Sequence, residues 1–183
     1  NLSVTEGVTA TSFVGDGNGR DIYYDTVGDV STDGSGGVRT RANVYIMETD
    51  RYLFEQHIHL DISSTTTIHF VVYECETLVC DLISEVVVTT SETGLGYYSS
   101  GQWEDDILLE NGNTYMLAAS WDTSAGYGWG ESSYPSFGSI LGHITNIGGD
   151  GVYPPPPSLT YSPGDLSISY NFAYVTSDEP INE

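Results

Sequence analysis

Hydrophobic and polar residues alternate along most of the chain, and this period of two is typical of β-strands. In the run 53–62, the residues at 58, 60 and 62 are isoleucine or leucine, whereas those at 57, 59 and 61 are polar. No window shows the 3.6-residue period of an amphipathic helix. The runs that we predict as strands are 2–10, 22–26, 44–48, 53–62, 68–72, 82–90, 94–100, 106–110, 114–121, 139–147 and 165–175.

Clusters of glycine, serine, asparagine and proline separate these runs, as turns separate antiparallel strands. About ten short strands with such turns predict an all-β fold, an antiparallel β-sandwich of the jelly-roll type. We expect a single domain over 1–183 that begins with a strand in 1–14, which is open to exchange with a neighbouring subunit. The four prolines at 154–157 predict a stiff spacer before a C-terminal strand at 165–175. This spacer fits an ordinary connection within the sandwich, or a strand handed to another molecule.

The charge of the chain excludes nucleic acid as a partner. There are 26 Asp and Glu against 4 Lys and Arg, for a formal net charge of −22, whereas phosphate binding requires basic residues. All four basic residues are arginine, which excludes Schiff-base, P-loop and lysine-isopeptide chemistry. No apolar run is long enough for membrane insertion, and an aromatic content of 12% argues against disorder.

The ends and the cysteines indicate an extracellular or cell-surface location. The chain starts at Asn1 without an initiator methionine, which we interpret as a mature N-terminus after removal of a signal peptide. Cys75 and Cys80 have the spacing of a disulfide across a hairpin loop, which forms in oxidising compartments. The alternative is a zinc site, but zinc usually requires a second pair of ligands.

Three histidines form the first candidate metal site. If 53–62 and 68–72 pair as a hairpin through a loop at 63–65, His59 lies opposite His69, with His57 on the same outward face. Three imidazoles on a rigid sheet would suit zinc or copper. The alternative is a solvated polar face that happens to contain histidine.

Calcium is the second candidate cofactor. Asp16, Asn18 and Asp21 begin like an oxygen-ligand loop, although Arg20 occupies the third ligand position of the EF-hand pattern and no glutamate closes the loop. Divalent cations would also reduce the self-repulsion of so acidic a chain. A halophilic origin explains the acidity equally well.

The aromatic stretch near the C-terminal third is a candidate contact surface. Tyr127, Trp129 and Tyr134 lie in a glycine-rich segment that we interpret as an exposed loop. Such rings stack on sugars and are also favoured at protein interfaces. There is no G-x-S-x-G, no H-E-x-x-H and no isolated cysteine nucleophile, so we predict that the chain is not an enzyme.

Part of the chain resembles a known class of module. The pieces "NVYIMETDRYLFEQHIHLDISSTTTIHFVVYE", "GLGYYSSG" and "LLENGNTYMLAASW" within 41–121 resemble the jelly-roll β-sandwich modules of large extracellular proteins of proteobacteria. This resemblance implies surface attachment or carbohydrate binding, with no common catalytic residues to carry over.

Two functions from different classes follow. The first is a structural extracellular subunit that self-assembles, as a filament or surface layer, by pairing its terminal strands with other copies. The alternating side chains of the N-terminal strand are Leu2, Val4, Val8 and Ala10. The second is a carbohydrate-binding adhesion module that uses the aromatic segment.

Overall fold

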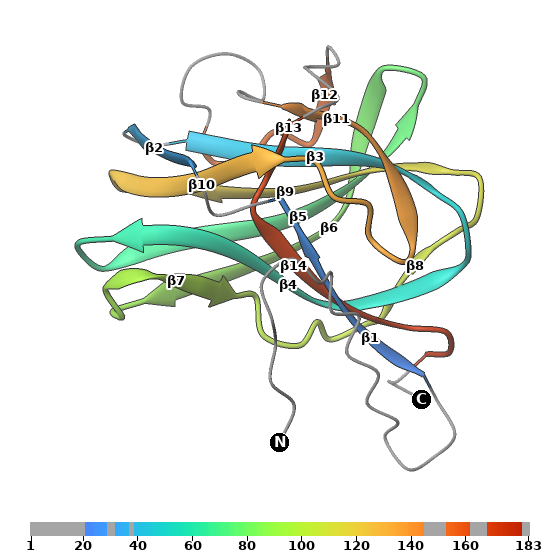
Figure 1. Ribbon diagram of the computed structural model, residues 1–183, viewed down its shortest axis with the longest axis horizontal. Helices are drawn as coiled ribbons and strands as arrows, with labels where there is room; N and C mark the ends of the chain where they lie inside the picture. Colours follow the sequence, from blue (N-terminus) through green and yellow to red (C-terminus); the bar gives the residue numbers. More distant parts are fainter. Residues whose placement is uncertain (1–20, 29–31, 37–38, 145–152, 162–167, 181–183) are drawn as a thin grey trace.

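The protein is all-β, and its two antiparallel sheets pack face to face (Figure 1). The computed structural model describes residues 21–28, 32–36, 39–144, 153–161 and 168–180. The described part contains fourteen strands and no helix, and so no helix there could span a membrane. The predicted antiparallel β-sandwich is confirmed, whereas the predicted number of about ten strands is too small.

Sheet A contains eight strands: β1 (Ile22–Val27), β2 (Thr32–Gly36), β4 (Arg51–Ile62), β7 (Gly94–Ser99), β8 (Ile107–Leu109), β10 (Ala125–Glu131), β13 (Ile168–Tyr170) and β14 (Phe172–Ser177). The long strand β4 is central. One side of it pairs with β14 and then β10, and the other side pairs with β8 and then β7. β1 pairs with β14, and both β2 and β13 pair with β10.

Sheet B contains six strands: β3 (Arg39–Met47), β5 (Thr66–Glu76), β6 (Val79–Thr90), β9 (Thr114–Trp121), β11 (Gly138–Ile144) and β12 (Ser158–Thr160). Their order across the sheet is β11-β3-β9-β5-β6-β12. The chain passes repeatedly from one sheet to the other, so strands that follow one another in sequence often face each other across the core.

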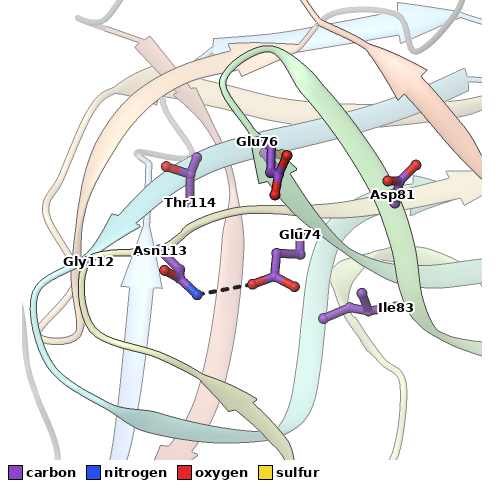
Figure 2. Close-up of a pocket in the computed structure, with 8 residues that line it drawn as sticks. Glu74, Glu76, Asp81, Ile83, Gly112, Asn113 and Thr114 are labelled. Atoms are coloured by element: carbon purple, nitrogen blue, oxygen red, sulfur yellow. Dashed lines mark hydrogen bonds between the residues drawn. The ribbon is translucent and has the colours of Figure 1, made fainter.

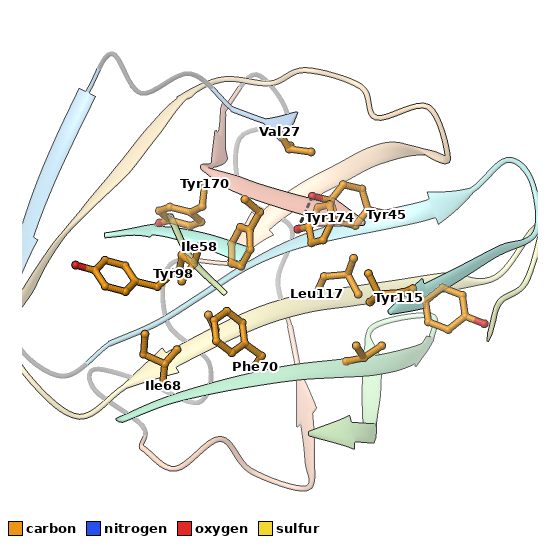
Figure 3. Close-up of a cluster of buried hydrophobic side chains, with 14 of the residues drawn as sticks. Val27, Tyr45, Ile58, Ile68, Phe70, Tyr98, Tyr115, Leu117, Tyr170 and Tyr174 are labelled. Carbon is orange, nitrogen blue, oxygen red and sulfur yellow. Dashed lines mark hydrogen bonds between the residues drawn. The ribbon is translucent and has the colours of Figure 1, made fainter. Parts of the chain in front are cut away.

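The main core lies between the sheets and is built from the inward positions of the alternating runs (Figure 3). Ile58 of β4 and Phe70 of β5 meet there from opposite sheets, and each is at most 1% exposed. Two buried tyrosines, Tyr45 and Tyr174, contact each other in this core, and their hydroxyl oxygens are 2.9 Å apart. Pairing the hydroxyls satisfies polar groups that burial would otherwise leave without partners.

A second, smaller core lies on the outer face of sheet B, under the proline-rich segment. Leu159 and Tyr161 pack there with Val71 and Tyr73 of the sheet. The Tyr73 hydroxyl donates to the Pro156 carbonyl oxygen at 2.8 Å, and the Leu82 N–H donates to the Pro157 carbonyl oxygen at 2.9 Å. The prolines at 154–157 therefore lie against sheet B, as an ordinary connection within the sandwich would.

The predicted C-terminal strand is two strands with a break at Asn171. β13 pairs with β10, whereas β14 lies between β1 and β4 of the same chain. Asn171 lies where the pairing of β4 with β10 ends. The His59 N–H donates to the Asn171 carbonyl oxygen, and the Asn171 N–H donates to the Gly128 carbonyl oxygen. Within the described residues, the end of the chain thus completes its own sheet.

The disulfide between Cys75 and Cys80 is confirmed, and the zinc alternative for these cysteines is wrong. The two residues lie opposite each other in the β5–β6 hairpin, beside its turn at Thr77–Leu78. The bond therefore closes only a short loop.

Replacing both cysteines by serine is expected to lower the free energy of unfolding by about 2 kcal/mol, because closing a short loop removes little entropy from the unfolded chain. Urea unfolding of the variant and of the reduced wild-type protein should show the same loss. Reductant should not change the stability of the variant, and a further loss there would contradict this account.

The side chain of Asn43 joins the two sheets through backbone groups. Its Nδ2 donates to the Tyr170 carbonyl oxygen and its Oδ1 accepts from the Tyr170 N–H, both at 2.9 Å. Asn43 is fully buried, so an apolar replacement leaves these two backbone groups without this partner.

Asn43→Leu is expected to lower the free energy of unfolding by about 3 kcal/mol, since each buried backbone group that loses its partner costs about 1–3 kcal/mol. Equilibrium unfolding in urea measures the loss. A loss well below about 1 kcal/mol would mean that other groups replace the amide.

Candidate functional site

The outer edge of β6 has no strand partner over most of its length, within the described residues. β5 covers one side of β6 from end to end, whereas β12 covers the other side only at 79–81. A β-bulge opposite Val72 and Tyr73 then marks the end of the covered part. From 83 to 90, no described strand pairs with the backbone on this side. We call 83–90 the open edge.

The side chains of the open edge favour pairing with another strand. Val86 and Val88 turn inward and pack against the main core, whereas Val87 points outward and is 51% exposed. Most residues of 83–90 are β-branched, and Glu85 is its one charged residue. Proteins usually protect an exposed edge with lysine, proline or several charges, and this edge contains no lysine or proline.

β7 carries further exposed apolar side chains, on the outer face of sheet A. It follows β6 after a short link at 91–93, and β4 is its one partner among the described strands. Its Leu95 is 65% exposed, and Tyr97 is 39% exposed. The described exposed apolar side chains are therefore concentrated between Leu78 and Tyr97, with Leu108 and Tyr134 outside this range.

The predicted three-histidine site is not formed, because β4 and β5 lie in different sheets. His57 and His59 lie on the outer face of sheet A, and His69 lies on the outer face of sheet B. The predicted alternation was right about which residues face the core, but the predicted hairpin was wrong. The described residues contain no group of three histidine, cysteine, aspartate or glutamate side chains arranged to hold a metal ion.

On sheet A, the two histidines lie among tyrosines and a glutamate. The rings of His59 and Tyr97 are 4.9 Å apart and those of His57 and Tyr24 are 5.9 Å apart, both edge to face. His57 Nε2 is 3.2 Å from the Glu55 carboxylate. Burial lowers the pKa of His57, although Glu55 opposes this shift, and burial raises the pKa of Tyr97 to about 12.

His69 on sheet B connects a carboxylate to a phenol. Its Nδ1 is 2.5 Å from Glu85 Oε1, and its Nε2 is 3.0 Å from the Tyr153 hydroxyl. The rings of His69 and Tyr153 are 4.9 Å apart and nearly perpendicular. We call these three side chains the Glu–His–Tyr triad. It fixes the beginning of the proline-rich segment to sheet B.

A shallow acidic pocket of about 360 Å³ lies at the disulfide end of sheet B (Figure 2). Glu74, Glu76 and Asp81 line it, and Asn113 Nδ2 donates to Glu74 Oε1 at 3.1 Å. Sequence patterns did not indicate this pocket, because its carboxylates come together only through the β5–β6 pairing.

Most of the predicted calcium loop lies outside the described residues, including Asp16 and Asn18. Asp21 is described, and its backbone N–H donates to Asp178 Oδ1 at 3.0 Å. Asp21 Oδ2 accepts from the Tyr23 hydroxyl at 3.4 Å. The predicted assembly residues Leu2, Val4, Val8 and Ala10 also lie outside the described residues.

The part of the aromatic segment that contains Tyr127 and Trp129 is a strand, β10, and there the prediction of an exposed loop was wrong. Tyr127 and Trp129 are partly buried and pack against the main core, where the Arg41 guanidinium lies 4.2 Å from the Tyr127 ring centre. Arg41 Nη2 donates to the Tyr127 hydroxyl at 2.7 Å. Tyr134, in contrast, is 65% exposed. The three aromatic residues therefore do not share one surface.

The open edge was the feature that the sequence analysis missed. Its signal was present as a run of β-branched residues at 83–90 without lysine or proline. Comparison with known proteins adds no assignment, since the chain matches no family model and no curated protein.

Proposed function

We propose that this chain is an extracellular structural protein that self-assembles by pairing β-strands between copies. The open edge of β6 is the observation that carries the proposal. An unprotected edge offers a row of backbone donors and acceptors that another strand can satisfy. The exposed apolar side chains of the open edge, such as Val87, add area that pairing would remove from water.

The strand that we propose for this edge is the N-terminal segment 2–10 of a second copy. Its length is close to that of 83–90, and its alternating pattern is that of a strand with one apolar face. Its charged residue, Glu6, interrupts the apolar side of this alternation. Extracellular location is supported by the Cys75–Cys80 disulfide, which oxidising compartments preserve.

Sedimentation velocity and electron microscopy of the full chain over a range of concentrations test the proposal. We expect linear polymers that grow with concentration, and monomers at the same concentrations once residues 1–11 are deleted. A full chain that remains monomeric at every concentration would contradict self-assembly. Polymers that survive the deletion would contradict the N-terminal strand as donor.

Calcium is part of the same proposal. Copies with a formal charge of −22 repel one another, and divalent cations bound to surface carboxylates reduce such repulsion. A chelator is therefore expected to shorten the polymers and to lower the unfolding temperature, and calcium should restore both. If the chelator changes neither the polymer length nor the unfolding temperature, calcium has no part in the assembly.

The alternative function is a carbohydrate-binding adhesion module, and one observation favours it. Tyr24, His57, His59 and Tyr97 place rings beside Glu55 on the outer face of sheet A. Sugars stack on aromatic rings and donate hydroxyl hydrogen bonds to carboxylates. A monomer that is retained on a polysaccharide column, and that Tyr97→Ala releases, would support this function over assembly.

A further inference from the structure

The Glu–His–Tyr triad has the arrangement of a phenol held against a base. A hydroxyl within hydrogen-bond reach of an imidazole, which a third group orients, is the geometry that activates hydroxyl groups in proteins. Here the hydroxyl is that of Tyr153, the base is His69 Nε2 at 3.0 Å, and the orienting group is Glu85 at 2.5 Å from Nδ1. The three residues come from β5, β6 and the proline-rich segment.

The direction of the proton follows from the hydrogen-bonding capacity of each group. An ionised carboxylate only accepts, so His69 Nδ1 carries the hydrogen that is donated to Glu85. In the neutral ring, Nε2 is then the acceptor, and the Tyr153 O–H donates to it. Other tyrosine hydroxyls have different partners. Tyr73 and Tyr98 donate to peptide carbonyl oxygens, and Tyr127 accepts from Arg41.

Ionisation of Tyr153 on its own is disfavoured. Burial raises the pKa of Tyr153, and the nearby carboxylates of Asp122 and Glu85 raise it further. The phenol therefore cannot readily release its proton to water and then an electron. With His69 Nε2 in place, proton and electron can leave in one step, since the base receives the proton as the electron departs.

The composition disfavours two common kinds of covalent link between copies and is rich in tyrosine, which can form a third. The chain contains 14 tyrosines and no lysine, and its two cysteines are joined to each other. A subunit of this composition cannot form lysine-based links. It can form a disulfide with another copy only after its own disulfide has been opened.

We propose that Tyr153 is the tyrosine at which this chain undergoes one-electron oxidation and forms a dityrosine link to a second copy. The oxidant is of the haem-peroxidase class with hydrogen peroxide. It takes one electron from Tyr153, and the phenol proton moves to His69 Nε2. The Tyr153 radical joins a tyrosyl radical of the second copy through ring carbons, and the two ring hydrogens move to the phenol oxygens as the rings regain aromaticity. The two protons that left the phenols pass to the reduced peroxide. Two tyrosines and one hydrogen peroxide thus give one dityrosine and two waters.

The two halves of this inference are separable. Oxidation at Tyr153 depends on the triad alone, whereas the link between copies rests on the assembly proposed above. The experiment therefore uses the full chain at a concentration where it is monomeric. Flash-generated tris(bipyridine)ruthenium(III) serves as the oxidant and N-acetyltyrosinamide traps the radicals, and peptide mapping by mass spectrometry locates the adducts.

We expect Tyr153 to carry more adduct than Tyr134, although Tyr134 is 65% exposed. His69→Phe should reduce the Tyr153 adduct about tenfold or more, because the base is lost while an aromatic ring remains. Glu85→Gln still accepts the Nδ1 hydrogen but lacks the charge, and it should give an intermediate yield. Oxidation of Tyr153 should also slow in deuterated water, as expected when the proton and the electron leave together.

A purely structural role for His69 predicts the opposite result. Removing the imidazole would then free the proline-rich segment and raise the reactivity of Tyr153. Adducts that follow exposure, with Tyr134 first and Tyr153 unchanged or higher in His69→Phe, would overturn the proposal. If Tyr153 oxidises as expected but concentrated protein forms no dityrosine between copies, the result contradicts the proposed assembly and leaves the role of the triad intact.

Discussion

Val87→Glu is expected to raise the concentration at which the chain assembles by about 100-fold or more. Burying a valine side chain contributes about 1.5–3 kcal/mol, and the variant would place a carboxylate in the junction instead. That carboxylate would meet a second copy that already carries a formal charge of −22. The sedimentation profile over a dilution series measures the shift.

The matched control for this variant is Tyr134→Glu, which adds the same charge at an exposed position outside the open edge. It should leave the assembly concentration within about threefold of the wild-type value, since its charge is screened by solvent. Leu95→Glu on β7, which is also outside the open edge, should behave as Tyr134→Glu does. Equal effects of all three variants would indicate that net charge, and not strand pairing at β6, governs association.

The second large effect is alkaline unfolding. Burial raises the pKa of Tyr45, Tyr73 and Tyr174, and all three are fully buried. The unfolded chain releases these protons from about pH 10, whereas the folded chain holds them to higher pH. The stability is therefore complete below pH 10 and falls above it by roughly 4 kcal/mol per pH unit for the three groups.

Because small domains have about 5–15 kcal/mol of stability, the protein should unfold cooperatively within a few pH units above 10. Tyrosine absorbance and circular dichroism should change together. Tyr174→Phe should reduce the pH dependence by about 1.4 kcal/mol per unit, since one proton fewer is released. Ionisation of all tyrosines before any loss of β structure would contradict this account.

The alternating pattern was enough to predict the sheets, because it reports which face of a strand is buried. The run 114–121 coincides with β9, and the inward residues of β4 and β5 were correct. The pattern does not report which strand is the partner. The short loop at 63–65 suits a hairpin, yet the same loop can lead from one sheet to the facing one, as it does here.

β10 was missed because glycine hides its alternation. Its inward positions are Ala125, Tyr127 and Trp129, while the positions between them are all glycine, which is common in loops. Asn171 forms contacts close to this strand, and a Cβ on Gly128 would lie only 2.2 Å from Asn171 Nδ2. The glycine therefore reflects a close approach between strands, which sequence reasoning can interpret only when the neighbour is known.

The candidate sites depend on pairing over long sequence distances. The residues of the open edge are visible in the sequence, but their lack of a partner is a property of the whole sheet. His69 and Tyr153 are 84 residues apart, and no local pattern joins them. Charge alone was a poor guide to chemistry, since 26 acidic residues produce many chance pairs.

The short strand β12 also has a geometric consequence for any polymer. Because it occupies β6 at 79–81, with Pro157 at Leu82, a strand from another molecule meets a fixed stop at that end. Every junction would then have the same offset along β6. Fibres built in this way should show a constant axial repeat, visible as sharp layer lines in diffraction patterns.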